Sequence, residues 1–137
     1  MLLRETTVLQ SAPLELARQF VSLSLKDVDI GFAGRQHERA RVHRAIAALR
    51  AGDPLTLRIE GDKRELWSGD GVCVGRLSRA FEMREGMRCI EAKVAAIVVW
   101  TRAWSQSEYA ASLKLDRWEV VVPELVLAPT MASPAPL

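Results

Sequence analysis

Alternating apolar residues in three short runs, separated by turns of a few residues, constrain the fold of this chain most strongly. PLTLRIE at 54–60 is followed by GDK and then RELWS at 64–68, and GDG leads into VCVGRLSRAF at 72–81. A period of two residues is typical of strands with one buried face, and glycine beside aspartate between such runs indicates a tight turn. We therefore expect a mainly β protein.

A longer β pattern follows in the second half of the chain. RCIEAKVAAIVVW at 88–100 alternates at first and then becomes apolar on both faces, as a strand that crosses a core would. SQSEYAAS at 105–112 is typical of a hairpin loop or a short helical turn. KLDRWEVVVPELVLAP at 114–129 then supplies one or two last strands, in which Pro123 marks an edge or a bend.

Helical patterns are confined to the first fifty residues. SAPLELARQF at 11–20 can open a helix with a serine as its N-cap, and residues 20–25 alternate as in a strand. A stronger helix is expected over about 35–50, before Gly52. Its apolar stripe consists of Val42, Ile46 and Leu49.

These patterns together predict an α+β fold: a small barrel or sandwich of short strands, flanked by one or two helices. We expect an N-terminal arm at 1–12 and a single β-rich domain over 13–128, whose N-terminal part is helical. A disordered tail rich in Pro, Ala and Ser is expected at 129–137. The length of 137 residues fits one domain with its own core.

Composition narrows the class of protein and its partners. The chain is 49% hydrophobic and 26% charged, as in soluble globular proteins, and its net charge is only +2. Any attraction to nucleic acid must therefore come from local basic patches. The N-terminus lacks a signal-peptide pattern, and the longest apolar run, at 94–100, is too short to cross a membrane, so we expect a cytoplasmic protein without a membrane partner.

Motifs for catalysis are missing from the sequence. Neither a phosphate loop for ATP nor a dinucleotide-binding glycine motif is present, and no local pattern supports a catalytic triad. Cys73 and Cys89 have no ligand spacing and are expected as small buried hydrophobes, while His37 and His43 point to different sides of the expected helix. We expect no metal, no cofactor and no enzymatic activity.

Arginines gather after the third alternating run. Arg76 and Arg79 follow Gly75 at the expected end of a strand, and Arg84 and Arg88 come shortly after. Guanidinium groups match phosphate oxygens, so such a rim is suited to phosphate contacts, although an ordinary charged loop has the same composition. A glycine at a strand end would also let another backbone approach closely.

Four tryptophans are present. Trp67 and Trp118 belong to expected strands and are expected in the core. Trp100 and Trp104 flank Arg102 at the exit of the longest strand, where they can stack unpaired bases as single-strand binders do. The same pair can instead cap the end of a barrel or contact a partner protein.

Several of these sequence segments, taken together, resemble a known protein region. GDPLTLR, RELWSGDGVCVGRLSRAF, GMRCIEAKVAAIVVW and DRWEVVVPELVLAP resemble the C-terminal accessory region of a bacterial group of RecQ-like DNA helicases. FVSLSLKDVDI resembles the segment that precedes it, so the likeness spans about residues 15–129. No helicase motor is present, so the resemblance implies a detached accessory module, a truncated gene or a subunit.

A more distant similarity, carried by GVCVGRLSR and the alanine/valine strand after it, is to HIRAN domains. This similarity implies a small OB-like β-barrel that binds single-stranded DNA or DNA ends, with the glycine–arginine turn on its binding face. HIRAN domains usually carry an Asn/Asp-rich turn before the glycine strand, where this chain has only Asp62.

Two functions from different classes are compatible with the sequence. The first is a non-enzymatic DNA-binding accessory domain associated with helicase or repair functions. Its expected nucleic-acid-binding residues are Arg76, Arg79, Arg88, Lys93, Trp100, Arg102 and Trp104. The second is a protein-interaction module whose aromatic patch docks on a helicase or repair partner.

Overall fold

The computed structural model describes residues 17–130 and shows a mainly β protein. One six-stranded antiparallel sheet runs in the order β1-β6-β5-β2-β3-β4. Its strands are β1 (Gln19–Ser22), β2 (Pro54–Glu60), β3 (Lys63–Ser68), β4 (Cys73–Arg76), β5 (Met87–Thr101) and β6 (Arg117–Pro129). Short helical segments join them: η1 (Leu25–Asp27), α3 (Arg41–Ala47), η2 (Arg102–Trp104) and α4 (Ser107–Ala110). No helix among the described residues is long and apolar enough to span a membrane.

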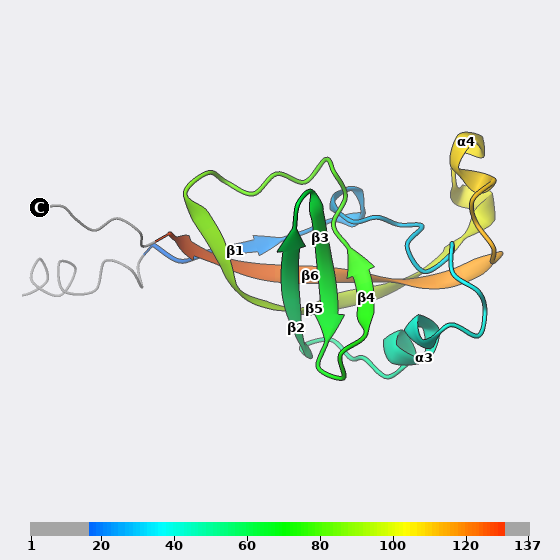
Figure 1. Ribbon diagram of the computed structural model, residues 1–137, viewed down its shortest axis with the longest axis horizontal. Coiled ribbons are helices and arrows are strands. Elements are labelled where there is room, and N and C mark those ends of the chain that lie inside the picture. The colour runs from blue at the N-terminus through cyan, green and yellow to red at the C-terminus, as the bar shows by residue number, and fades with distance from the viewer. Residues whose placement is uncertain (1–16, 131–137) are drawn as a thin grey trace, which may run out of the picture.

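A long hairpin of β5 and β6 forms the main axis of the molecule (Figure 1). β2 pairs with β5 only through Pro54 and Leu55, and β2, β3 and β4 then stand across the hairpin (Figure 1). α3 packs against β4 and β6, and α4 lies at the tip of the hairpin. The two sets of strands therefore enclose the core between them.

Backbone hydrogen bonds link the segment after β1 to the end of β4. Asp29 N donates to Arg76 O at 2.8 Å, and Ser78 N donates to Asp27 O at 2.8 Å. Val28 forms a bridge with Leu77 between these two bonds. Because β1 and β4 are the outermost strands of the sheet, one short segment connects both of its edges.

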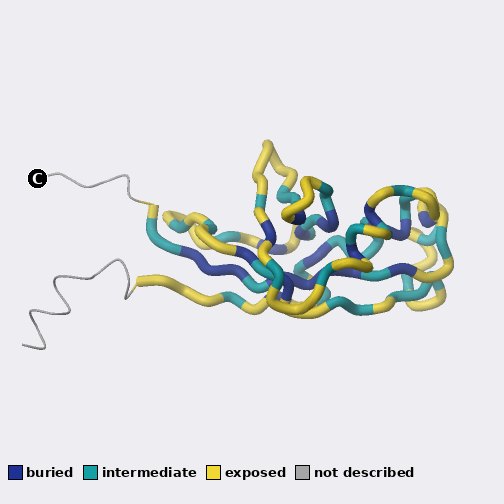
Figure 2. The backbone as a smooth tube through the Cα atoms, turned by 90° about the horizontal axis from the view of Figure 1, so that it is seen from below, coloured by how far each residue is buried: buried dark blue, intermediate teal, exposed yellow. Residues whose placement is uncertain are grey.

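Buried residues, dark blue in Figure 2, lie mainly along the middle of the molecule. The most completely buried large ones are Ile46, Leu66, Val74, Val94, Pro123 and Leu125. We expected the apolar residues of β5 from about residue 95 onward to be buried on both faces of the strand. Instead, Ala95, Ala96 and Val99 are exposed. The strand with two buried faces is instead β6, because it lies between β1 and β5 and also packs under α3.

The short strands agree with their sequence patterns. β2 covers 54–60 as predicted, β3 and β4 follow after the two glycine turns, and the C-terminal pattern forms a single strand, β6. Pro123 lies opposite Val94, at a register shift between β5 and β6. It comes one residue before Glu124, the first residue of β6 that pairs with β1. A proline at an irregularity beyond the paired stretch loses little of the ladder.

The helix expected at 35–50 is wrong at its N-terminal end, since α3 begins only at Arg41. The preceding residues are held in turns by Gln36 Nε2, which donates to Phe32 O, and by Arg39 N, which donates to His37 Nδ1. Local bonds of this kind compete with helix formation. The expected stripe is confirmed, with Val42 and Ile46 buried and Leu49 packed against the core.

Other expectations near the ends lie partly outside the described residues. The arm at 1–12 and nearly all of the tail at 129–137 are outside them, as is most of the helix expected at 11–20. The last residues of that helix, Gln19 and Phe20, belong to β1 instead. The strand expected to reach Leu25 ends at Ser22, where η1 follows shortly.

Two tryptophans were expected in the core, and one is there. Trp118 is 4% exposed, and its Nε1 donates to Ile30 O at 2.8 Å. Trp67 is half-buried on the outer face of β3. The Arg58 guanidinium lies over its ring, 4.0 Å from the ring centroid, and its Nε1 donates to Glu65 Oε1. The core prediction for Trp67 is wrong, because its neighbour Leu66 takes the inward position of the strand.

Trp118 also fixes the loop between η1 and α3, through a glycine. A Cβ at Gly34 would lie 2.6 Å from two atoms of the Trp118 ring, so only glycine allows the loop to rest on the indole. The carbonyl of Gly34 accepts hydrogen bonds from Lys114 N and Leu115 N. The loop, β6 and the hairpin tip therefore meet at this residue.

Replacing Gly34 by alanine should destabilise the protein by about 1–3 kcal/mol, since the new methyl overlaps a buried ring that has no room to move. The matched control is Gly69→Ala, because a Cβ at Gly69 would meet nothing within 4 Å. Urea unfolding followed by tryptophan fluorescence measures both. Equal midpoints for the two variants would contradict the packing of Gly34 on Trp118.

Candidate functional site

A groove of about 780 Å³ lies between the segment after β1, the ends of β3 and β4, and the tip of the β5–β6 hairpin. Its wall carries five cations: Lys26, Arg35, Lys63, Arg76 and Arg79. Two carboxylates, Asp29 and Asp62, line it as well, so positive charge is in excess by three. Three aromatic residues complete it: Trp100, Trp104 and Tyr109.

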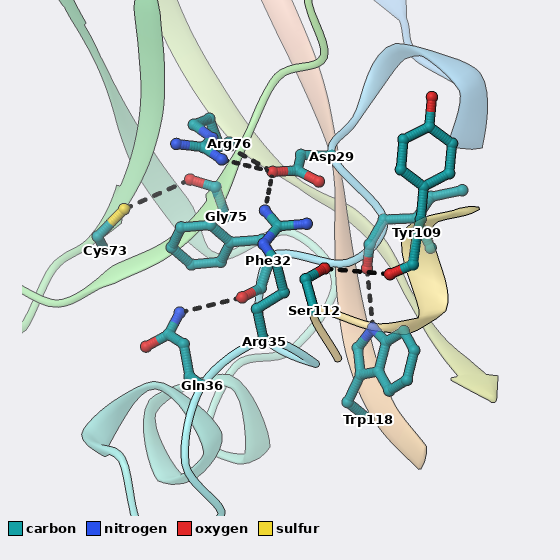
Figure 3. Close-up of polar contacts among 11 residues, drawn as sticks. Asp29, Phe32, Arg35, Gln36, Cys73, Gly75, Arg76, Tyr109, Ser112 and Trp118 are labelled. Atoms are coloured by element: carbon teal, nitrogen blue, oxygen red, sulfur yellow. Dashed lines mark hydrogen bonds and ion pairs between the residues drawn. The ribbon is translucent and has the colours of Figure 1, made fainter. Parts of the chain in front are cut away.

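Asp29 organises the inner wall of the groove. Arg76 donates to Asp29 Oδ2 from Nη2 at 2.8 Å and from Nε at 3.3 Å, and Arg35 Nη2 pairs with the same oxygen. Figure 3 shows both guanidinium groups pointing at this one carboxylate, with Phe32 beside them. We call these three charged residues, Asp29, Arg35 and Arg76, the Asp29 cluster. Its net charge is +1, and the side chains of Arg35 and Arg76 are each about one-third exposed.

The cluster also sets the protonation of its carboxylate. Burial alone would raise the pKa of Asp29, but hydrogen bonds and charge from Arg35 and Arg76 outweigh it and hold the pKa below its ordinary value of 3.8. Asp29 is therefore ionised at neutral pH. Since its folded pKa is lowered, its contribution to stability is complete above about pH 4 and is lost as the pH falls through the folded pKa.

β4 ends at Arg76, and the second arginine of the expected rim, Arg79, lies in the loop after the strand. Arg76 is the last residue of the strand, and Gly75 beside it is buried. A Cβ at Gly75 would meet Leu66 at 3.4 Å and Val121 at 3.9 Å. The close approach that we expected at this glycine is therefore made by core side chains, since Gly75 is inside the strand rather than at its open end.

Arg79 lies in the loop after β4, which another arginine shapes. Arg64 of β3 donates from Nη2 to Ser78 O at 2.9 Å and also donates to Phe81 O. Its guanidinium lies 5.7 Å from the centroid of the Phe81 ring. These contacts fold the loop back on β3, which leaves Arg79 exposed at the rim of the groove.

The hairpin tip brings the aromatic residues to the same groove. Trp100 ends the apolar part of β5, and Trp104 follows in η2. Their rings meet edge to face, with centroids 5.1 Å apart and planes at 82°. Trp104 and Tyr109 are 61% and 63% exposed, so two aromatic surfaces are open to a ligand.

Arg102, between the two tryptophans, supports the tip. It donates to Ala110 O and Leu113 O at 3.0 Å each and to Asp116 Oδ1 at 3.1 Å. Its donors therefore bind the loop that carries Tyr109, and Arg102 does not line the groove.

Of the seven residues that the sequence singled out, the structure brings four together around the groove: Arg76, Arg79, Trp100 and Trp104. Arg88 is exposed at the far end of β5, opposite Ala128, and Lys93 pairs with Glu124 at 3.3 Å. Neither lines the groove.

Sequence reasoning missed Lys26, Arg35, Lys63 and Tyr109. Lys63 was noted only as part of the GDK turn, and Lys26, in the connection after β1, was not singled out. Their basic charge inside turn segments was the available signal. Without the fold, nothing indicated that these turns adjoin the hairpin tip.

The two cysteines lie on β4 and β5, outside the groove lining, and each is half-buried rather than fully buried. Burial raises the pKa of both thiols above the ordinary value of 9.0. Both are therefore protonated and poorly nucleophilic at neutral pH. Within residues 17–130 no cluster of three or more His, Cys, Asp or Glu side chains is placed to hold a metal ion.

Comparison of the chain with models of protein families, with curated proteins and with solved structures yields no match.

The Asp29 cluster predicts a pH-dependent loss of stability. Asp29→Asn should lower the free energy of unfolding by about 1–2 kcal/mol at pH 7, because two guanidinium groups lose their ionic partner. The difference from the wild type should shrink below about pH 4, where the wild-type carboxylate becomes protonated. Urea titrations at several pH values measure it, with the exposed turn variant Asp70→Asn as the control. A deficit that stays constant down to pH 2 would contradict the ionic role of Asp29.

Proposed function

We propose that this protein is a non-enzymatic accessory domain that binds single-stranded DNA in the groove. The observation that carries the proposal is the convergence of five cations and three aromatic residues on one groove. Cations that follow a phosphate backbone, together with aromatic rings that stack bases, are the usual equipment of single-strand binders. The resemblance to the accessory region of RecQ-like helicases and to HIRAN domains supports the same class of ligand.

Each part of the groove has a separate task in this proposal. Lys26, Lys63 and Arg79 form no ion pair among the described residues, so they are free to contact phosphates. Trp104 and Tyr109 offer exposed ring faces, and a base must be unpaired to stack on them. A duplex keeps its bases stacked on one another, so this arrangement favours single strands and unpaired ends.

We also propose that the sheet is an OB-like barrel of the HIRAN type. Its support is the backbone link from the segment after β1 to Leu77 and Ser78 after β4, which connects the two outer strands. An OB-like barrel is partly open and binds oligonucleotides across its strands and loops. The groove lies beside this link, since Val28, Leu77 and Ser78 all line it.

The double variant Lys63→Ala/Arg79→Ala should weaken binding of an oligo-dT strand by about tenfold or more at low salt, because two phosphate contacts are removed. The dependence of log Kd on log salt should become shallower by about one to two units. Fluorescence polarisation with labelled single-stranded, duplex and 3′-tailed DNA at two salt concentrations measures both quantities.

The matched control is Arg44→Ala/Arg50→Ala, which removes the same charge from exposed positions outside the groove. It should leave the affinity within about twofold of the wild type. If both double variants lose affinity equally, DNA is attracted by net charge alone and the groove is not its site. A wild-type protein that binds none of the three DNAs at low salt would refute the proposed function.

The exposure of Trp104 and Tyr109 also favours a second function, docking on a protein partner such as a helicase or repair protein. An apolar contact hardly responds to salt, whereas phosphate contacts weaken steeply. Trp104→Ala should weaken DNA binding by about fivefold or more if the ring stacks a base, since such stacking contributes about 1–3 kcal/mol per base. If this variant binds DNA like the wild type, the exposed ring belongs to a protein interface instead.

A further inference from the structure

One buried polar atom of a groove-lining residue has no hydrogen-bond partner. Among the described residues, Trp100 Nε1 is the single buried side-chain nitrogen or oxygen without a hydrogen-bond partner. The other buried indole, that of Trp118, donates to Ile30 O, and even the half-buried Trp67 donates to Glu65. A buried donor without an acceptor is destabilising, so such a group in a native protein calls for a physical explanation.

The position of this donor points to a ligand. Trp100 lines the groove together with Trp104 and Tyr109, and the Trp104 ring packs against it. An aromatic ring can supply at most a weak N–H···π contact in place of an oxygen acceptor. Because Trp104 is itself 61% exposed, its side chain can turn away from Trp100 with little loss of packing.

We propose that the indole N–H of Trp100 donates a hydrogen bond to an oxygen of the bound nucleic acid, after the strand has drawn the Trp104 ring into a stack with a base. This proposal rests on the proposed function of the groove and assigns Trp100 the role of donor rather than of stacking ring. The acceptor is either a phosphate oxygen of the backbone or a carbonyl oxygen of a base. In the free protein the Trp100 N–H has no hydrogen-bond partner, so binding breaks no hydrogen bond of this group.

Trp100→Phe tests the donor, because phenylalanine keeps an aromatic ring and lacks only the N–H and part of the indole. The variant should bind oligo-dT about tenfold more weakly, which corresponds to about 1.4 kcal/mol. Its unfolding midpoint should fall somewhat, because Trp100 packs against the core and part of its indole is lost, so affinities are compared at a temperature at which both proteins are folded. Trp67→Phe, which removes an indole outside the groove lining, should leave affinity unchanged.

The two possible acceptors are separated by the DNA used. A strand of difluorotoluene nucleotides keeps the phosphates and the stacking rings of oligo-dT but lacks its base carbonyls. If Trp100→Phe weakens both ligands by the same factor, the acceptor is a phosphate; if it weakens only oligo-dT, the acceptor is a base. Equal affinities of variant and wild type for both ligands overturn the proposal.

A second measurement does not depend on the stability of the variant. The four tryptophans give four indole N–H signals in a ¹H–¹⁵N spectrum, which single Trp→Phe variants assign. Addition of oligo-dT to the wild type should move the Trp100 signal downfield, as a new bond to oxygen requires, and should leave that of Trp118 in place. If the Trp104 signal moves and that of Trp100 does not, DNA binds the groove but Trp100 is not a donor. If the wild type binds no DNA, the proposed function and the donor role both fail.

Discussion

The Asp29 cluster joins the segment after β1 to the end of β4, and these two strands are the outermost ones of the sheet. The segment after β1 must cross to β4, and there a carboxylate meets guanidinium groups from two directions, Arg35 from its own loop and Arg76 from the strand. Backbone bonds at Asp27 and Asp29 fix the same crossing. A half-buried carboxylate needs such partners, because its charge would otherwise oppose burial. These ion pairs and the backbone bonds together hold one wall of the groove in place.

The same cluster decides which cations are available to a ligand. Arg76 and Arg35 already share the charge of Asp29, so an approaching phosphate must compete with that carboxylate for their donors. Lys26, Lys63 and Arg79 have no such partner among the described residues and keep their full attraction. The groove thus combines a rigid basic wall with a more adaptable basic rim. If the groove binds DNA as proposed, affinity and its salt dependence should come mainly from the rim, and the wall should fix the position of the strand.

Local signals predicted the elements well where packing and periodicity agree. The alternation at 54–60 and the apolar stripe with Val42 and Ile46 depend only on neighbouring residues, and both are observed. Trp67 was misjudged because the choice of the inward face of β3 depends on the packing of the whole fold. The residues before Arg41 were misjudged because local side-chain bonds there compete with the helix. The groove combines residues from four separate segments, which no spacing rule could place together. Arg76, Arg79, Trp100 and Trp104 were found only because each carries suitable chemistry by itself.

Arg102 illustrates how a suitable residue type can serve a site without lining it. Its guanidinium donates to two backbone carbonyls and a carboxylate of the hairpin tip, so few of its donors remain for a ligand. Those bonds instead hold the turn that carries Tyr109 and the start of β6 close to the exit of β5. Lys114 and Leu115 bind the same tip to Gly34, whose loop begins at the Asp29 cluster. The aromatic side of the groove and its basic side are therefore connected through the backbone of one loop. A DNA strand bound across the groove would contact both of these sides.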